Sequence, residues 1–225
     1  YVASGESREV FRADRGVGSN FHGWNSSKQI YWGAGDYIVF PWEKNGWLNL
    51  WSVPLGGGEA ISLTPGDFEV QFGSLTPDRT AVVYDSNQDD IDRKHVWQVP
   101  VDGSASPRRL TWGEGIEWSP VKTSGGQLAF LASDGTTPAH AEIMEGDTDR
   151  RALVADWLPT DFPKGHLVEP EQVVFSAADG LMIHGQLFLP SDLAPGERRP
   201  AVIFFHGGSR RQMLLGFHHS GYYHN

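Results

Sequence analysis

A unit made of a strand, a glycine-bearing turn and a short second strand occurs twice in this chain, and its spacing limits the fold more than any other feature. One copy runs from residue 50 to residue 64, and the other runs from residue 96 to residue 111. Each copy has a tryptophan in its first strand and ends in Leu-Thr. The two tryptophans are 46 residues apart and the two threonines are 47 residues apart: Trp51 and Trp97, Thr64 and Thr111. A period of about 40–45 residues is typical of four-stranded propeller blades, so the repeat predicts an antiparallel β-propeller.

Ser/Thr-Pro dipeptides form a second repeated element. Thr76-Pro77 and Ser119-Pro120 are each expected to end a strand, and a more apolar strand follows at residues 81–86 and 127–133. Proline presets the φ angle that such a turn needs. The spacing therefore predicts the same strand order in consecutive blades.

The first part of the chain adds one more hairpin to this pattern. Residues 28–32 and 37–40 are strand-like and flank Gly-Ala-Gly-Asp at residues 33–36, which predicts a hairpin. No long stretch of residues 1–155 has a helical period. We therefore expect a mainly β chain in which residues 1–160 form a partial WD40-like propeller of about three blades, entered midway through a blade at Tyr1.

Composition excludes several classes of function. The formal net charge of −10 argues against nucleic acid as a partner, because phosphate binding needs a surplus of Lys and Arg. The chain has no cysteine, so disulfides and thiolate metal sites are excluded. No apolar run approaches the roughly 20 residues that span a bilayer. The glycine runs at residues 16–18 and 56–58 lack the Lys-Ser/Thr of a phosphate loop. We expect no cofactor, no metal and no membrane segment, while cytoplasmic, periplasmic and secreted locations all remain compatible.

The character of the chain changes after residue 154. Residues 154–170 carry Pro and Gly without a regular period and are expected to be a linker. Two strand-like runs around Asp179-Gly180 then predict a hairpin. Residues 200–205 are continuously apolar, as in a strand buried on both faces, and His206-Gly207-Gly208 follows directly.

This series resembles the entry to the catalytic domain of prolyl oligopeptidase family serine peptidases, with dipeptidyl peptidases and acylaminoacyl peptidases most similar. The resemblance is loose over the blades and tight over residues 168–212. It implies that residues 161–225 begin an α/β-hydrolase domain. It also implies that the nucleophilic Ser, its Asp and its His lie downstream, because no Gly-x-Ser-x-Gly occurs in these 225 residues.

The glycine-rich turn is the candidate oxyanion hole. Glycine lets the backbone approach a ligand closely, and the N–H groups of Gly207 and Gly208 can stabilise negative charge on a carbonyl oxygen. Some family members have Tyr at the position of His206, so backbone donors are the safer assignment. Arg210 and Arg211 are candidates for contacting a substrate carboxylate or backbone, with a solvated or ion-paired role as the alternative. Ser209 lacks the second glycine of a nucleophile elbow.

Other polar residues carry weaker signals. The histidines near the C-terminus have no carboxylate beside them to complete a zinc site. Dipeptidyl peptidases anchor the substrate amine with carboxylates from the propeller side, and the candidates here match no motif: Glu114, Glu117, Asp89 and Asp90. Asp89-Asp90-Ile91-Asp92 lacks the spacing of a calcium-binding EF-hand.

These observations predict a part of a serine-type peptidase that cleaves short peptides through an acyl-enzyme. The chain itself is expected to be inactive, because it contains none of the triad. A non-enzymatic propeller that binds a protein or peptide, and an esterase for small acyl esters, are the alternatives. Substrate preference, exo- or endopeptidase action and homo-oligomerisation of the full-length protein stay open.

Overall fold

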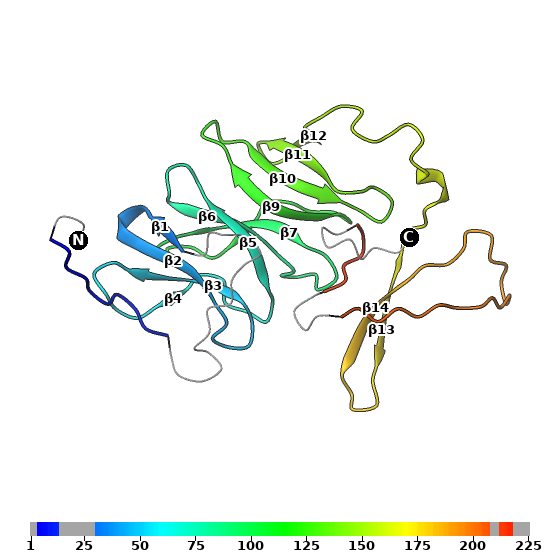
Figure 1. Cartoon of the computed structure of the whole chain (residues 1–225), viewed down its shortest axis with the longest axis horizontal. Coiled ribbons are helices and arrows are strands. Elements are labelled where there is room, and N and C mark those ends of the chain that lie inside the picture. The colour runs from blue at the N-terminus through cyan, green and yellow to red at the C-terminus, as the bar shows by residue number, and fades with distance from the viewer. Residues whose placement is uncertain (1–3, 14–29, 208–211, 218–225) are drawn as a thin grey trace.

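Three four-stranded antiparallel sheets make up most of the molecule (Figure 1). The computed structural model describes residues 4–13, 30–207 and 212–217 of the 225. In each sheet, strands that are consecutive in sequence are also neighbours in space, as expected for propeller blades. The first sheet contains β1 (Tyr31–Gly33), β2 (Tyr37–Trp42), β3 (Asn49–Pro54) and β4 (Ile61–Ser62). The second contains β5 (Val70–Leu75), β6 (Ala81–Ser86), β7 (His95–Pro100) and β8 (Arg108–Arg109). The third contains β9 (Ile116–Lys122), β10 (Leu128–Ser133), β11 (His140–Glu145) and β12 (Asp149–Ala152).

The expected mainly β fold is thus confirmed over the described residues, and the three four-stranded sheets are consistent with propeller blades. The hairpin at residues 33–36 is also present, where a short 3-10 turn, Ala34–Asp36, joins β1 to β2. Residues 28 and 29, which were assigned to its first strand, lie outside the described residues.

The Leu-Thr ending of the repeat has a physical cause. The side-chain oxygen of Thr64 accepts a hydrogen bond from the backbone N–H of Leu50 at 2.8 Å. In the second blade Thr111 accepts from the N–H of Val96, also at 2.8 Å. Each threonine side chain therefore bonds to a backbone N–H of the third strand of its blade, at a point beyond the end of the two-residue fourth strand. In the third blade the N–H of Leu153 bonds to the carbonyl of Ala141 at 2.9 Å, and valine follows in place of threonine.

Only one of the two Ser/Thr-Pro dipeptides ends a strand. Thr76-Pro77 follows β5, and its turn closes through a 2.8 Å bond from the N–H of Arg79 to the carbonyl of Thr76. The prediction for Ser119-Pro120 was wrong, because both residues lie inside β9. Ser119 has a φ of 53° and the register with β10 shifts between Ala129 and Leu131. The dipeptide forms a β-bulge, which accommodates a proline that has no N–H for the ladder.

The middle blade is buried on both of its faces. Alternate side chains of β6 point in opposite directions, so Val82 and Tyr84 join one core cluster while Val83 joins another. The first cluster includes Val39 and Leu50 of the first blade. The second cluster joins the middle blade to four residues of the third: Leu128, Phe130, Ala132 and Met144. The three sheets are therefore stacked by two separate apolar interfaces.

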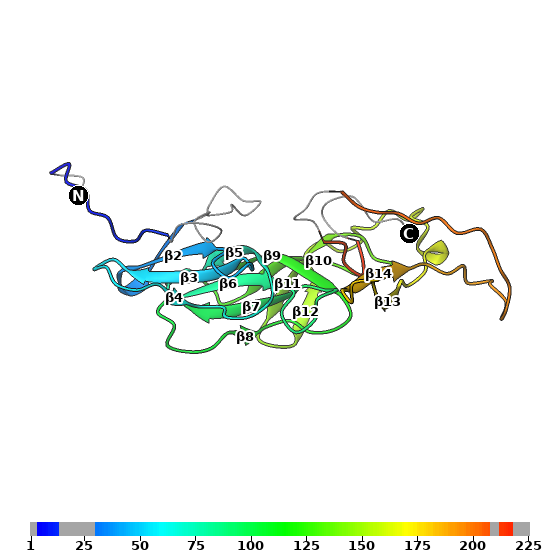
Figure 2. The same cartoon turned by 90° about the horizontal axis from the view of Figure 1, so that it is seen from below.

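A two-stranded hairpin follows the third blade. Strands β13 (Glu171–Ser176) and β14 (Met182–Leu187) pair antiparallel around Asp179-Gly180, as predicted. Gly180 has a φ of 89°, a conformation that glycine adopts at no steric cost. The hairpin projects beyond the blades in both views (Figure 1, Figure 2).

The expectation of a buried strand at residues 200–205 was wrong. No strand forms there, and the side chains point into solvent, with 97% of Val202 and 85% of Phe205 exposed. A strand needs neighbours that pair its backbone and cover its faces, and the described residues place no sheet beside this run. No helix in the described part of the chain is long and apolar enough to cross a membrane.

Candidate functional site

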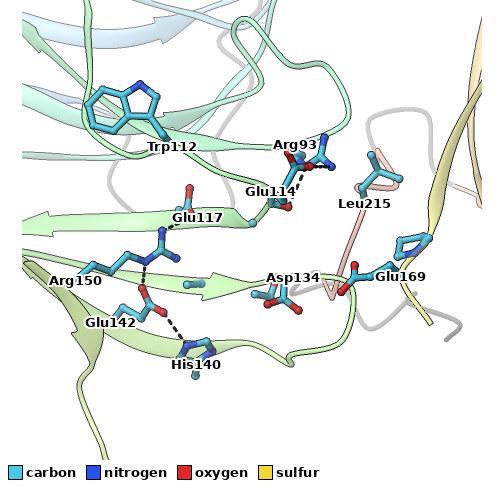
Figure 3. Close-up of a pocket in the computed structure, with 14 residues that line it drawn as sticks. Arg93, Trp112, Glu114, Glu117, Asp134, His140, Glu142, Arg150, Glu169 and Leu215 are labelled. Atoms are coloured by element: carbon cyan, nitrogen blue, oxygen red, sulfur yellow. Dashed lines mark hydrogen bonds and ion pairs between the residues drawn. The ribbon is translucent and has the colours of Figure 1, made fainter. Parts of the chain in front are cut away.

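A pocket of about 590 Å³ lies at the edge of the third blade, where the chain passes toward the hairpin (Figure 3). It is formed by loops of the second and third blades, by strands β9 to β12 and by residues just before β13. Its charged lining residues are Arg93, Glu114, Glu117, Asp134, Glu142, Arg150 and Glu169. Five carboxylates against two guanidinium groups give the pocket an acidic balance.

Glu117 is the centre of the closed end of this pocket. Its side chain is fully buried on β9. One carboxylate oxygen accepts hydrogen bonds from His95 Nδ1 at 2.8 Å and from the hydroxyl of Thr111 at 2.9 Å. The other oxygen accepts from Arg150 at 2.8 Å. A buried charge is tolerated when it is paired and hydrogen-bonded in this way.

The contacts of Glu117 set its protonation state. Burial by itself would raise the pKa of Glu117, but the hydrogen bond from His95 and the positive charge of Arg150 outweigh it, so the pKa is lowered. Burial would lower the pKa of Arg150, yet the charge of Glu117 and the hydrogen bond to Glu142 leave it raised. Both groups are therefore charged at neutral pH.

Arg150 links Glu117 to a second carboxylate. Its guanidinium also bonds to Glu142, and Glu142 accepts from His140 Nε2 at 2.9 Å. His140 and Glu142 are two residues apart on β11, so their side chains lie on the same face. The ring of Trp157 stacks on His140 with 4.3 Å between ring centroids and 9° between planes. The network forms a rigid wall from the blade interior to the pocket opening.

The open end of the pocket carries carboxylates that solvent can reach. Glu114 is exposed and pairs with Arg93, while Asp134 accepts from the backbone N–H groups of Thr136 and Thr137 at 2.8 and 2.6 Å. Glu169 is exposed just before β13. The indole of Trp112, 54% exposed, also lines the pocket, apart from Asp134 and Glu169 (Figure 3). Exposed acidic groups suit a cationic ligand.

The sequence-predicted oxyanion residues lie away from this network. His206 and Gly207 are exposed, and His206 Nδ1 lies 3.5 Å from the carbonyl oxygen of Gly207. Gly208, Arg210 and Arg211 lie outside the described residues. The oxyanion and substrate-binding roles of these residues stay predictions.

Two of the four carboxylates considered from sequence do line the pocket, namely Glu114 and Glu117. Asp90 instead pairs with Arg93 at 3.1 Å within its own loop, and Asp89 is exposed.

Sequence reasoning missed four members of the network: His95, His140, Glu142 and Arg150. The period-2 placement of His140 and Glu142 in a strand was an available signal. His95 and Arg150 reach Glu117 from 22 and 33 residues away in sequence, and no local pattern reveals such pairs.

Comparison with known proteins agrees with this architecture. Residues 9–139 match the family model described as the dipeptidyl peptidase IV (DPP IV) N-terminal region. This match covers more than half of the chain. The chain belongs to the dipeptidyl peptidase IV N-terminal region family. The earlier resemblance to prolyl oligopeptidase family peptidases is thereby confirmed.

Individual relatives cover limited parts of the sequence. "Probable dipeptidyl peptidase 4" of Aspergillus clavatus is 33% identical over 109 residues, which is 48% of this chain and 14% of that protein. "Tricorn protease homolog 1" of Streptomyces coelicolor is 29% identical over 154 residues, which is 65% of this chain and 13% of that protein. "Probable dipeptidyl peptidase 4" of Aspergillus fumigatus is 22% identical over 182 residues, or 79% of this chain. The chain spans between 13% and 24% of the length of these relatives.

Proposed function

We propose that this chain is the propeller side of a serine-type peptidase that cleaves short peptides through an acyl-enzyme. In that reaction a serine attacks the scissile carbonyl, a histidine acts as base and then as acid, and an aspartate orients the histidine. None of these three groups is identifiable in the 225 residues, which lack a Gly-x-Ser-x-Gly elbow. They would belong to a longer protein in which residues 1–160 are propeller and residues 161–225 begin the peptidase domain.

The acidic pocket is the observation that carries this proposal. It lies between the third blade and the residues that lead into the hairpin, so a ligand there would meet both proposed domains. The free amine of a peptide is a cation that the carboxylates at the open end could bind. Glu117 is already paired with Arg150 and hydrogen-bonded to His95, and Glu114 pairs with Arg93. Asp134 and Glu169 are therefore the carboxylates that remain for the substrate.

The turn at His206 and Gly207 would act on the other side of the substrate. The backbone N–H groups of Gly207 and Gly208 would hold the oxyanion, and each such donor contributes about 2.7–4 kcal/mol to catalysis. Arg210 and Arg211 would contact the substrate backbone or its carboxylate. The proposed partner is therefore a short peptide.

The first experiment separates the chain from the longer protein. The 225-residue chain should neither turn over a dipeptidyl chromogenic substrate nor react with a fluorophosphonate probe, whereas the longer gene product should do both. The coding sequence that follows should contain Gly-x-Ser-x-Gly and then Asp and His in that order. Turnover by the 225-residue chain that a serine-directed inhibitor blocks would contradict the proposal.

A second experiment tests the pocket in the longer protein. Glu169→Gln should raise KM about three- to tenfold for a peptide with a free amine, because an attraction of about 1.4 kcal/mol corresponds to a tenfold change in affinity. The KM for the same peptide with an acetylated amine should stay constant. Glu59→Gln, an exposed carboxylate of the first blade, is the matched control. Equal changes in KM for the free and the acetylated peptide would exclude amine binding in this pocket.

A further inference from the structure

The loop between β6 and β7 connects the second blade to the hairpin through one carboxylate. Asp92 in this loop is 5% exposed. Its Oδ2 accepts a hydrogen bond from His184 Nδ1 at 2.8 Å and another from the side-chain amide of Gln172. Gln172 belongs to β13 and His184 to β14. A single oxygen thus binds both strands of the hairpin.

The two donors share one face of the hairpin. Val174 pairs with His184 and Gln172 pairs with Gln186. Because side chains alternate between the two faces of a strand, these four lie on the same face of the hairpin. Most hairpin residues are exposed. The polar face therefore docks on the loop by hydrogen bonds and without a large apolar interface.

The same loop also holds residues 212–217. The N–H of Leu215 bonds to the carbonyl of Asp92 at 3.0 Å, and the amide of Gln212 bonds to the carbonyl of Ile91. The side chain of Gln186 donates to the carbonyl of Leu214. Leu214 is 1% exposed and packs on Ile116 and Trp118 of β9. Residues 212–217 are thus fixed between the blades and the hairpin.

The loop is also held by contacts of its own. The backbone N–H of Asp92 bonds to Asp90 at 3.1 Å, and Asp90 in turn pairs with Arg93 at 3.1 Å. Arg93 also donates to the carbonyl of Glu114 at 2.9 Å. Side chains locked by such contacts hold a functional group more precisely than a free loop does.

We propose that Asp92 is a positioning residue, which holds β13–β14 and residues 212–217 on the propeller and so sets the place of the turn at His206 and Gly207. This inference rests on the peptidase function proposed above. The nearer anchor is Gln212, five residues after Gly207, which this loop binds directly, whereas β14 ends 19 residues before His206. Movement of an oxyanion donor by about 1 Å can cost about 100-fold in rate.

The contact itself is tested in the 225-residue chain by hydrogen exchange. Asp92→Leu removes the acceptor and keeps the branched shape of the side chain, and it should speed exchange at least tenfold in β13, β14 and residues 212–217. Asp92→Asn can still place an oxygen toward both donors and should retain protection. Asp89→Asn, an exposed residue of the same loop with a φ of 65°, is the control. Unchanged protection in Asp92→Leu would overturn the proposal.

The positioning role is tested in the longer peptidase. Asp92→Leu should lower kcat about 100-fold while KM changes less than threefold, and Asp92→Asn should restore most of kcat. His184→Phe removes one of the two donors to Asp92. Because His184 is more exposed than Asp92, this substitution is the milder one for folding. It should also lower kcat. Wild-type activity in both Asp92→Leu and His184→Phe would overturn this proposal alone. Absence of activity in the unmodified longer protein would overturn the proposed function together with it.

Discussion

The threonines that end the repeated units differ in one contact, and this difference predicts unequal costs for the same substitution. Thr64 and Thr111 are both buried, and each accepts from a backbone N–H at 2.8 Å. Thr111 also donates to the carboxylate of Glu117 at 2.9 Å. Substitution by valine keeps the shape of the side chain and removes only the hydroxyl.

The magnitudes follow from these contacts. Thr64→Val leaves the N–H of Leu50 buried without a partner, which costs about 1–3 kcal/mol. Thr111→Val leaves the N–H of Val96 in the same state and also removes a hydrogen bond to a charged group, which is worth about 1.5–3 kcal/mol more. Thr111→Val should therefore be the more destabilising change.

Urea unfolding of the 225-residue chain measures both free energies. A loss of about 2 kcal/mol lowers the midpoint by about 1 M when the slope is near 2 kcal/mol per M. Thr148→Val, in the exposed turn between β11 and β12, is the control and should change stability by less than about 0.5 kcal/mol. Equal losses for Thr64→Val and Thr111→Val, or a larger loss at position 64, would refute the reasoning.

Two further predictions concern the buried network and a close backbone contact. Because the folded pKa of Glu117 is below its ordinary value of 4.5, its stabilisation is present above about pH 4.5 and is lost as the pH falls through the folded pKa. Glu117→Gln should cost about 3–5 kcal/mol at pH 7 and progressively less in urea titrations at pH 4 and pH 3, whereas a pH-independent cost would contradict this. Gly33→Ala would place a Cβ 2.9 Å from the buried Val101 side chain, so it should cost about 1–3 kcal/mol. Gly56→Ala, with no atom within 4 Å, should be neutral, and equal melting temperatures for the two variants would exclude strain at Gly33.

The parts of the fold that sequence could predict depend on local geometry. The strands that contain Trp51 and Trp97 formed as the repeat predicted. The hairpin around Asp179-Gly180 also formed, because its turn depends on neighbouring residues only. Ser119-Pro120 was misplaced because a proline inside a bulge and a proline in a turn have the same local sequence. Residues 200–205 were misplaced because an apolar run becomes a strand only when other chain segments cover it.

The site was less predictable than the blades. A glutamate between Ile116 and Trp118 gave a signal for a buried carboxylate, but its partners His95 and Arg150 lie 22 and 33 residues away in sequence. Asp92 was considered only as part of a calcium loop, and its actual donors are 80 and 92 residues away. Long-range pairing of polar groups depends on the assembled fold.

The sandwiched position of β6 has a consequence for how this region can vary among related sequences. All six residues from Ala81 to Ser86 are buried. Val82 and Tyr84 belong to the interface with the first blade and Val83 to the interface with the third. A substitution at any of these three positions disturbs one interface, and a one-residue insertion would exchange the two side-chain sets at once. Sequence diversity should therefore be lowest in this strand and greatest in exposed turns such as residues 56–59, a pattern that saturation mutagenesis of the two segments would reveal.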